Sequence, residues 1–301
     1  MISQPGAPAT TIMTAACPCC DSHDWNARWP GFVICRRCGV MTVERNFDLT
    51  VLRQHYGRNY FQGDEYLDYE GDRAVHEKTL QQHLRLVRRF VPRGEGLLEI
   101  GAAYGYYLEL ARAHYPGSVG VELSMAAAEA GIARGLDIRI GDLLELEFDR
   151  DFAAVCLWDT IEHLSRPREV IQRAVDLLKP GGHLFLTTGD FGSWLPRLQG
   201  LKWRQIHPPT HLFYFTRPSL DCLCQRSGMH VVEFGTVNVY RRLRSSLEAL
   251  AKFHTSTLPG QLAKAALKLI PAPLLDRGFS LNLRDTLYLV AQKTADQHPA
   301  K

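Results

Sequence analysis

Short apolar segments alternate with amphipathic ones from Gly96 onward, and this alternation restricts the possible folds more than any other feature of the chain. Nearly all-apolar strands are typical of a parallel sheet that is covered on both faces. Serial strand–helix units predict an α/β fold with a doubly wound, mostly parallel sheet. We expect strands at Leu97–Ile100, Ser118–Val121, Asp137–Ile140, Phe152–Leu157 and His183–Thr188, and helices at Tyr106–Ala113, Met125–Ala133 and Pro167–Leu178.

The segments around this core differ from it in composition and suggest a domain order. Residues 237–280, which we expect to be a helical insertion, carry Leu, Ala, Lys and Arg at helical spacing. We therefore expect this insertion to pack on the core or to form a lid. A homodimer contact or a contact with an acidic membrane surface are the alternatives. The expected parts are a disordered leader (1–16), a cysteine-rich module (17–45), a helical cap and linker (46–95), the core (96–236), a helical insertion (237–280), a final core strand (281–293) and a disordered tail (294–301).

Charge and hydropathy argue against several classes of protein. The formal net charge of +3 is too small to indicate nucleic-acid binding by itself. No apolar run reaches the roughly 18 residues of a membrane helix, and the first 16 residues lack the basic start of a signal peptide. These features predict a cytoplasmic protein.

Five of the eight cysteines lie between Cys17 and Cys38, which favours metal binding over disulfides in a chain without a secretory signal. Two C-x2-C pairs separated by a short hairpin supply the four soft donors of a tetrahedral zinc ribbon. Four protein ligands close the coordination shell, so the zinc is expected to be structural. Cys19 is a spare thiol or a competing ligand, and the alternative is a set of unligated or redox-active cysteines. The expected ligands are Cys17, Cys20, Cys35 and Cys38.

The turn after the first core strand has small residues at alternate positions, Gly101, Ala103 and Gly105, after Glu99. Such a turn lets the backbone approach a ligand, and the next helix offers free N–H groups. NAD, FAD and S-adenosylmethionine sites all use turns of this kind. Acidic residues end the next two strands. Glu122 is placed to hold ribose hydroxyls, and Asp142 to accept a hydrogen bond from an adenine amino group.

The ordered motifs EIGAAYG, GVELS, GDLLEL, LWDTIEHL and LLKPGG resemble those of the Rossmann-like S-adenosylmethionine-dependent methyltransferases. This resemblance implies a seven-stranded sheet and S-adenosylmethionine as cofactor. Ala103 stands where many relatives carry glycine, and we expect its methyl group to be tolerated because no pyrophosphate binds there. The resemblance assigns cofactor contacts to Glu99, Gly101, Ala103, Gly105, Glu122, Leu123, Asp142, Leu143, Trp158 and Asp159.

Two flanking segments, 56–69 and 203–216, resemble a bacterial methyltransferase group common in glycan and small-molecule biosynthesis. The resemblance implies a cap over the cofactor's methyl group, in which we place Tyr60, Phe61 and Tyr66. A hydroxyl acceptor must lose a proton, and histidine suits that task near neutral pH. The alternative is that the candidate histidines brace loops. Because Pro208 and Pro209 separate two of them, these two are not a helix-borne metal pair. The candidates are His163, His207 and His211.

The sequence therefore predicts a methyltransferase that modifies an oxygen or a sugar carbon of a small molecule or glycan precursor. One alternative is an RNA methyltransferase whose ribbon grips the nucleic acid, although few basic and aromatic residues are available there. Another is a catalytically silent protein that retains the cofactor fold, against which the intact Glu122 and Asp142 argue.

Overall fold

The computed structural model describes residues 15–44, 71–253, 255 and 257–294. Most of the expected leader, the cap residues Tyr60, Phe61 and Tyr66, and nearly all of the expected tail lie outside these described residues.

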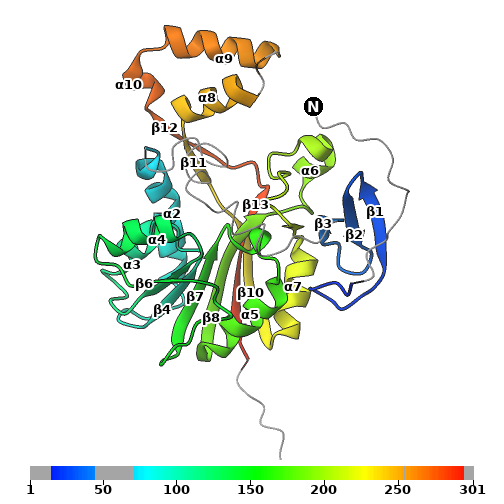
Figure 1. The fold of residues 1–301 in the computed structure, drawn as a ribbon, viewed down its shortest axis with the longest axis vertical. Coiled ribbons are helices and arrows are strands. Elements are labelled where there is room, and N and C mark those ends of the chain that lie inside the picture. Colours follow the sequence, from blue (N-terminus) through cyan, green and yellow to red (C-terminus); the bar gives the residue numbers. More distant parts are fainter. Residues whose placement is uncertain (1–14, 45–70, 254, 256, 295–301) are drawn as a thin grey trace, which may run out of the picture.

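The centre of the molecule is a seven-stranded sheet in the order β10-β13-β8-β7-β4-β5-β6 (Figure 1). The strands from β4 to β8 run parallel, and β13 is antiparallel to both β8 and β10. This confirms the mostly parallel, seven-stranded sheet. The bounds are β4 (Leu97–Ile100), β5 (Val119–Glu122), β6 (Ile138–Ile140), β7 (Phe152–Trp158), β8 (Leu178–Gly189), β10 (Met229–Thr236) and β13 (Thr286–Lys293).

Helices cover both faces of this sheet, as a doubly wound fold requires. Along β7, Val155 and Leu157 pack in one hydrophobic cluster and Ala154 and Cys156 in the other, because successive side chains of a strand point to opposite faces. The first cluster includes side chains of α5 (Pro167–Asp176) and α7 (Arg217–Arg226), and the second those of α2 (Arg73–Val87), α3 (Tyr106–Ala111) and α4 (Met125–Ile132).

Two parts of the chain differ from the sequence expectation. Strand β8 begins at Leu178, which pairs with Phe152, so the Pro-Gly-Gly turn that was expected to precede the strand lies within it. The segment after β8 contains three elements that were not expected from the sequence: α6 (Trp194–Gln199), a 3-10 turn at Gly200–Lys202 and the short strand β9 (Phe213–Tyr214).

The cysteine-rich module forms a second sheet of β1 (Trp25–Trp29), β2 (Phe32–Cys35) and β3 (Met41–Val43), and the fourth strand of this sheet is β9. Met41 lies opposite Tyr214 in an antiparallel pair. The carboxylate of Asp21 bonds Arg168 of α5 and Arg226 of α7. The module is therefore joined to the core by backbone pairing and by charge.

A helical insertion lies between β10 and β13 in the sequence and projects beyond the carboxyl ends of the parallel strands (Figure 1, orange). It contains β11 (Val239–Arg242), α8 (Leu243–Phe253), α9 (Leu258–Leu269), α10 (Ala272–Leu275) and β12 (Gly278–Leu281), with β11 and β12 paired as a ribbon. None of the described helices has the length and apolar character needed to cross a membrane.

Candidate active site

A cavity of about 730 Å³ opens at the carboxyl ends of β4 and β7. Its walls come from the loop after β4, the 3-10 turn η2 (Ile161–His163), the segment before β9, helix α2 and the start of the insertion. In a doubly wound fold, ligands bind at this edge of the sheet. Among the predicted site residues, the cavity is lined by Glu99, Gly101, Ala103, Trp158, Asp159, His163, His207 and His211.

Gly101 is held in a conformation that only glycine fits. Its φ is +77°, and a Cβ at this position would lie 2.6 Å from the Thr160 hydroxyl oxygen. The backbone N–H groups of Gly101 and Ala102 both donate to the Val121 carbonyl, which fixes the turn against β5. The loop therefore presents bare backbone to the cavity, as expected of a cofactor cradle.

Ala103 also has a left-handed backbone, with φ of +48°. Its N–H donates to the Glu122 carboxylate at 2.7 Å, and the other carboxylate oxygen of Glu122 accepts from the Ser124 N–H at 2.7 Å. The left-handed region costs a residue with a Cβ about 1 to 2 kcal/mol. This gives a physical reason for glycine in related chains and shows that the alanine methyl group is accommodated at a cost in strain.

Five predicted cofactor residues lie outside the cavity lining: Gly105, Glu122, Leu123, Asp142 and Leu143. Asp142 already has two partners, since one of its carboxylate oxygens accepts from the Leu144 N–H at 3.0 Å and the other pairs with Arg166 at 3.2 Å. The sequence did not predict that Arg166 pairs with Asp142. An adenine amino group would share the Asp142 carboxylate with it.

Glu99 Oε2 and Trp158 Nε1 are among the buried polar atoms of the cavity wall that have no hydrogen-bond partner in the described residues, as are both ring nitrogens of His83. Burial raises the pKa of Glu99, and the nearby charge of Glu122 adds to this effect. An unsatisfied acceptor and an unsatisfied donor cost free energy unless a ligand provides the missing bonds. These residues therefore fit a cofactor with its own polar groups, such as the amino-acid part of S-adenosylmethionine.

The three predicted histidines meet in the wall of the same cavity, although they come from two separate segments. The rings of His163 and His211 are perpendicular, with centroids 4.5 Å apart, and the rings of His207 and His211 stack at 4.2 Å. Nδ1 of His163 lies 2.9 Å from the Thr210 carbonyl oxygen. Burial lowers the pKa of His211 well below 6.5, and the neighbouring histidines lower it further, so this ring is neutral at neutral pH.

Other cavity residues were not anticipated from the sequence. His83 of α2 is buried with its ring centroid 4.2 Å from that of Trp158, and burial lowers its pKa to about 3. Glu162 is buried beside His163. Arg241 and Arg242 of β11 could have been predicted as cavity residues, because they are adjacent basic residues in the insertion that was expected to form a lid. The cationic residues lining the cavity are Lys202, Arg204, Arg241 and Arg242.

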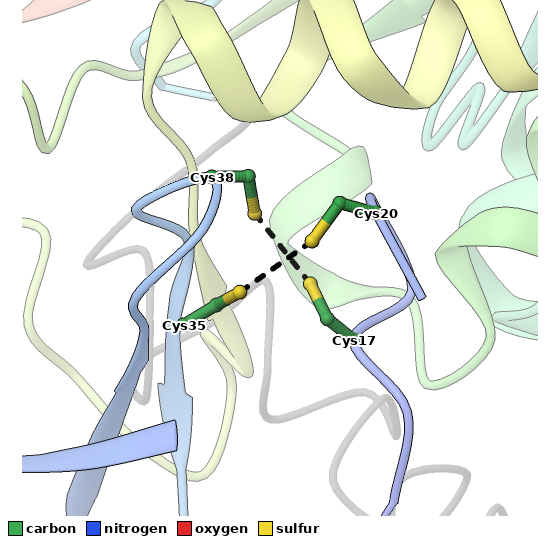
Figure 2. Close-up of side chains that lie close together, drawn as sticks. All are labelled: Cys17, Cys20, Cys35 and Cys38. Atoms are coloured by element: carbon green, nitrogen blue, oxygen red, sulfur yellow. Dashed lines mark hydrogen bonds between the residues drawn. The ribbon is translucent and has the colours of Figure 1, made fainter. Parts of the chain in front are cut away.

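The four expected zinc ligands converge in the N-terminal module, and Figure 2 shows their sulfur atoms pointing toward a common centre. The Sγ atoms of Cys17 and Cys38 are 3.5 Å apart, as are those of Cys20 and Cys35. A tetrahedral zinc with Zn–S bonds near 2.3 Å needs sulfur separations of roughly 3.8 Å, so the thiols fit the ion. Cys19 is buried nearby but is not one of the four.

Comparison with known proteins adds three kinds of finding. A family model described as a methyltransferase domain matches residues 72–233. The C-methyltransferase NovU of Streptomyces niveus is 29% identical over 224 residues, which cover 69% of this chain and 48% of NovU.

Two further relatives match shorter parts. A dTDP-4-amino-2,3,4,6-tetradeoxy-D-glucose N,N-dimethyltransferase of Saccharopolyspora spinosa is 32% identical over 33% of this chain and 42% of its own length. A tRNA U34 carboxymethyltransferase of Desulfotalea psychrophila is 35% identical over 54% and 51%, respectively. The chain thus spans about half of these curated relatives, or less.

Among solved structures, magnesium protoporphyrin IX methyltransferase from Synechocystis, with bound S-adenosylhomocysteine (SAH), has a TM-score of 0.52 at 14% identity. The match covers 82% of this chain and 100% of that one. At this identity the likeness shows the fold.

Proposed function

The chain belongs to the methyltransferase domain family and is an S-adenosylmethionine-dependent methyltransferase, and we propose that its acceptor is a small molecule or glycan precursor, methylated on oxygen or on a sugar carbon. The observation that carries this proposal is one shared cavity, in which the loop from Glu99 to Ala103 and the histidine cluster both stand.

S-adenosylmethionine supplies a methyl group that is bonded to a cationic sulfur. A lone pair of the acceptor bonds to the methyl carbon, and the electrons of the carbon–sulfur bond return to the sulfur, which leaves. The loop after β4 binds the cofactor, and the histidine cluster orients the acceptor and takes up the proton that it loses. Positioning of this kind is a large part of catalysis when two reactants must align. His163, His207 and His211 are the candidate proton acceptors because they line the cavity and a neutral imidazole can take up a proton.

An anionic acceptor, such as a sugar that carries a nucleotide diphosphate, would meet cationic side chains in the cavity. Lys202, Arg204 and Arg241 line it, and Arg204 also pairs with Asp285 at 2.9 Å. The matched dimethyltransferase of Saccharopolyspora spinosa acts, by its name, on a dTDP-linked sugar. Residues of β11 and α8 also line the cavity, which favours the lid interpretation of the insertion.

An RNA acceptor is the alternative, favoured by the similarity to the tRNA U34 carboxymethyltransferase. The exposed Arg36 and Arg37 of the cysteine-rich module would then contact phosphates. Binding of tRNA that weakens steeply with salt would support this alternative over a small acceptor.

We propose that the ion held by Cys17, Cys20, Cys35 and Cys38 is zinc and that it is structural, because all four positions are filled by protein thiols.

The test combines binding and turnover. Calorimetry with S-adenosylhomocysteine should show one site per chain, and a screen of nucleotide-linked sugars and other small acceptors should show methyl transfer from labelled S-adenosylmethionine. His163→Ala, His207→Ala and His211→Ala should lower turnover while S-adenosylhomocysteine still binds. Absence of S-adenosylhomocysteine binding would overturn the proposal.

A further inference from the structure

Glu162, His163 and His211 form a cluster that a plain methyl-transfer site does not require. One donor atom from each residue, a carboxylate oxygen and two ring nitrogens, lies within 4.8 Å of the other two. Glu162 and His211 are buried, at 2% and 6% exposure, while His163 is partly open to the cavity.

The backbone holds the two segments of this cluster together. Glu162 and His163 belong to η2, and His211 comes from the chain before β9. The N–H of Leu212 donates to the Glu162 carbonyl oxygen at 2.8 Å. The three donors are therefore pre-positioned by hydrogen bonds of the main chain.

The ring of His163 is oriented by a backbone group. Nδ1 of His163 donates to the Thr210 carbonyl, which places the lone pair of the neutral ring on Nε2. Metal-binding histidines commonly use one ring nitrogen in this way, because the bond fixes the tautomer and aims the other nitrogen at the ion.

We propose that Glu162, His163 and His211 bind one divalent cation in the wall of the cofactor cavity. Two imidazoles and one carboxylate suit a divalent transition metal such as Mn²⁺, Fe²⁺ or Zn²⁺ and leave further coordination positions free. This site is separate from the cysteine cluster, whose four thiolates fill the shell of their own ion.

The consequence for the reaction rests on the proposed function. A cation here would bind the acceptor oxygen that loses its proton, and would stabilise the anion that attacks the methyl group. His207 stacks on His211 and is the histidine that this ligand set leaves out. The proton would then pass to His207 or to water, and the methyl carbon would bond to the acceptor as its bond to sulfur breaks.

The site can be tested with the full-length protein in its zinc-loaded form. Mn²⁺ prefers nitrogen and oxygen donors to thiolates, so titration followed by electron paramagnetic resonance reports the proposed site and not the cysteine cluster. We expect one Mn²⁺ per chain. Glu162→Gln and His211→Ala should weaken its binding about tenfold or more, whereas His230→Ala, at an exposed histidine of β10, should not change it.

Calorimetry with S-adenosylhomocysteine on the same samples shows that each variant is folded and separates the two proposals. If S-adenosylhomocysteine binds but Mn²⁺ does not, or binds equally to all variants, the cation site is wrong and the histidines serve only as hydrogen-bonding groups. If Mn²⁺ binds with the expected losses but no acceptor is methylated, the cation site stands and the proposed acceptor class fails.

Discussion

The hydroxyl group of Thr42 donates a hydrogen bond to the carbonyl oxygen of Leu212 at 2.9 Å, and so links the cysteine-rich module to the residue that follows His211. The N–H of Val43 donates to the same carbonyl at 3.3 Å, and the N–H of Leu212 reaches the Glu162 carbonyl. The Leu212 peptide groups therefore connect strand β3 to the turn that carries His163. The ribbon acts as a support for the acceptor side of the cavity.

Thr42→Val should weaken this support without unfolding the module. One buried hydrogen bond is lost, which lowers the free energy of unfolding by about 1 kcal/mol, and the Leu212 carbonyl keeps its bond from Val43. Turnover should fall more than S-adenosylhomocysteine affinity. Thr294→Val is the matched control, because its hydroxyl also donates to a carbonyl, that of Gly228, but at an exposed position just after the end of β13. Equal effects of the two variants on turnover would contradict the linkage.

Disruption of the cysteine cluster should act on the same side of the site. In Cys35→Ser/Cys38→Ser the module loses two of its four thiols, and the β3–β9 pairing loses its scaffold. We expect methyl transfer to fall about tenfold or more, because misalignment of the acceptor that raises the activation barrier by about 1.4 kcal/mol lowers the rate tenfold. The affinity for S-adenosylhomocysteine should stay within about threefold of wild type. Loss of S-adenosylhomocysteine binding as well would show that the ribbon supports the whole core.

Gly101→Ala should weaken cofactor binding. The added methyl group meets Thr160 at 2.6 Å in a backbone conformation that disfavours a side chain, so the loop must shift away from the cavity. Isothermal titration should show at least a tenfold loss of S-adenosylhomocysteine affinity. Gly96→Ala, whose added Cβ would meet Phe152 at an ordinary 3.6 Å, should bind like wild type. Wild-type affinity in Gly101→Ala would show that the loop is not the cofactor cradle.

Ala103→Gly should stabilise the protein. Glycine avoids the left-handed strain of about 1 to 2 kcal/mol, but it loses up to about 1 kcal/mol through the greater freedom of the unfolded chain. The net gain expected in urea unfolding is about 0.5 to 1 kcal/mol. A destabilised variant would mean that the alanine methyl group makes contacts that outweigh the strain.

His83→Leu should make the protein less sensitive to acid. Burial lowers the pKa of His83 to about 3, whereas the unfolded chain takes up the proton near 6.5, so this residue costs stability as the pH falls from 6.5 toward 3. The stability of the wild type should fall about 1.4 kcal/mol per pH unit more steeply than that of the variant between pH 6 and 4. NMR titration of His83 in the folded protein near pH 6.5 would contradict this account.

The sequence was sufficient for the parallel strands of the central sheet because these strands are apolar and followed by glycine or acidic residues, features that depend on local sequence alone. It was not sufficient for β9. That strand has only two residues, Phe213 and Tyr214, and its partner Met41 lies far away in the chain. No local pattern marks such a pair.

The candidate site likewise has residues that could be predicted from the sequence and contacts that could not. Residue type identified the glycine loop and the three histidines, since their chemistry is visible in the sequence. The partner of Asp142 depends on where Arg166 lies in space, and the ring stacking of His207 on His211 depends on how the chain turns between them. Glu162 stands next to a predicted residue, but only its burial and its distance to His211 distinguish it from an ordinary surface acid.

The pairing of β3 with β9 also limits where this chain can be shortened or mutated. The family match begins at residue 72, after the ribbon, yet Met41 and Val43 share a hydrophobic cluster with Trp203, Leu212 and Tyr214. A shortened chain starting at residue 72 would leave the backbone of β9 unpaired and this cluster half uncovered, which favours aggregation. The unit that folds is thus larger than the region that the family model matches, and mutations in β3 should be tolerated mainly when β9 accommodates them.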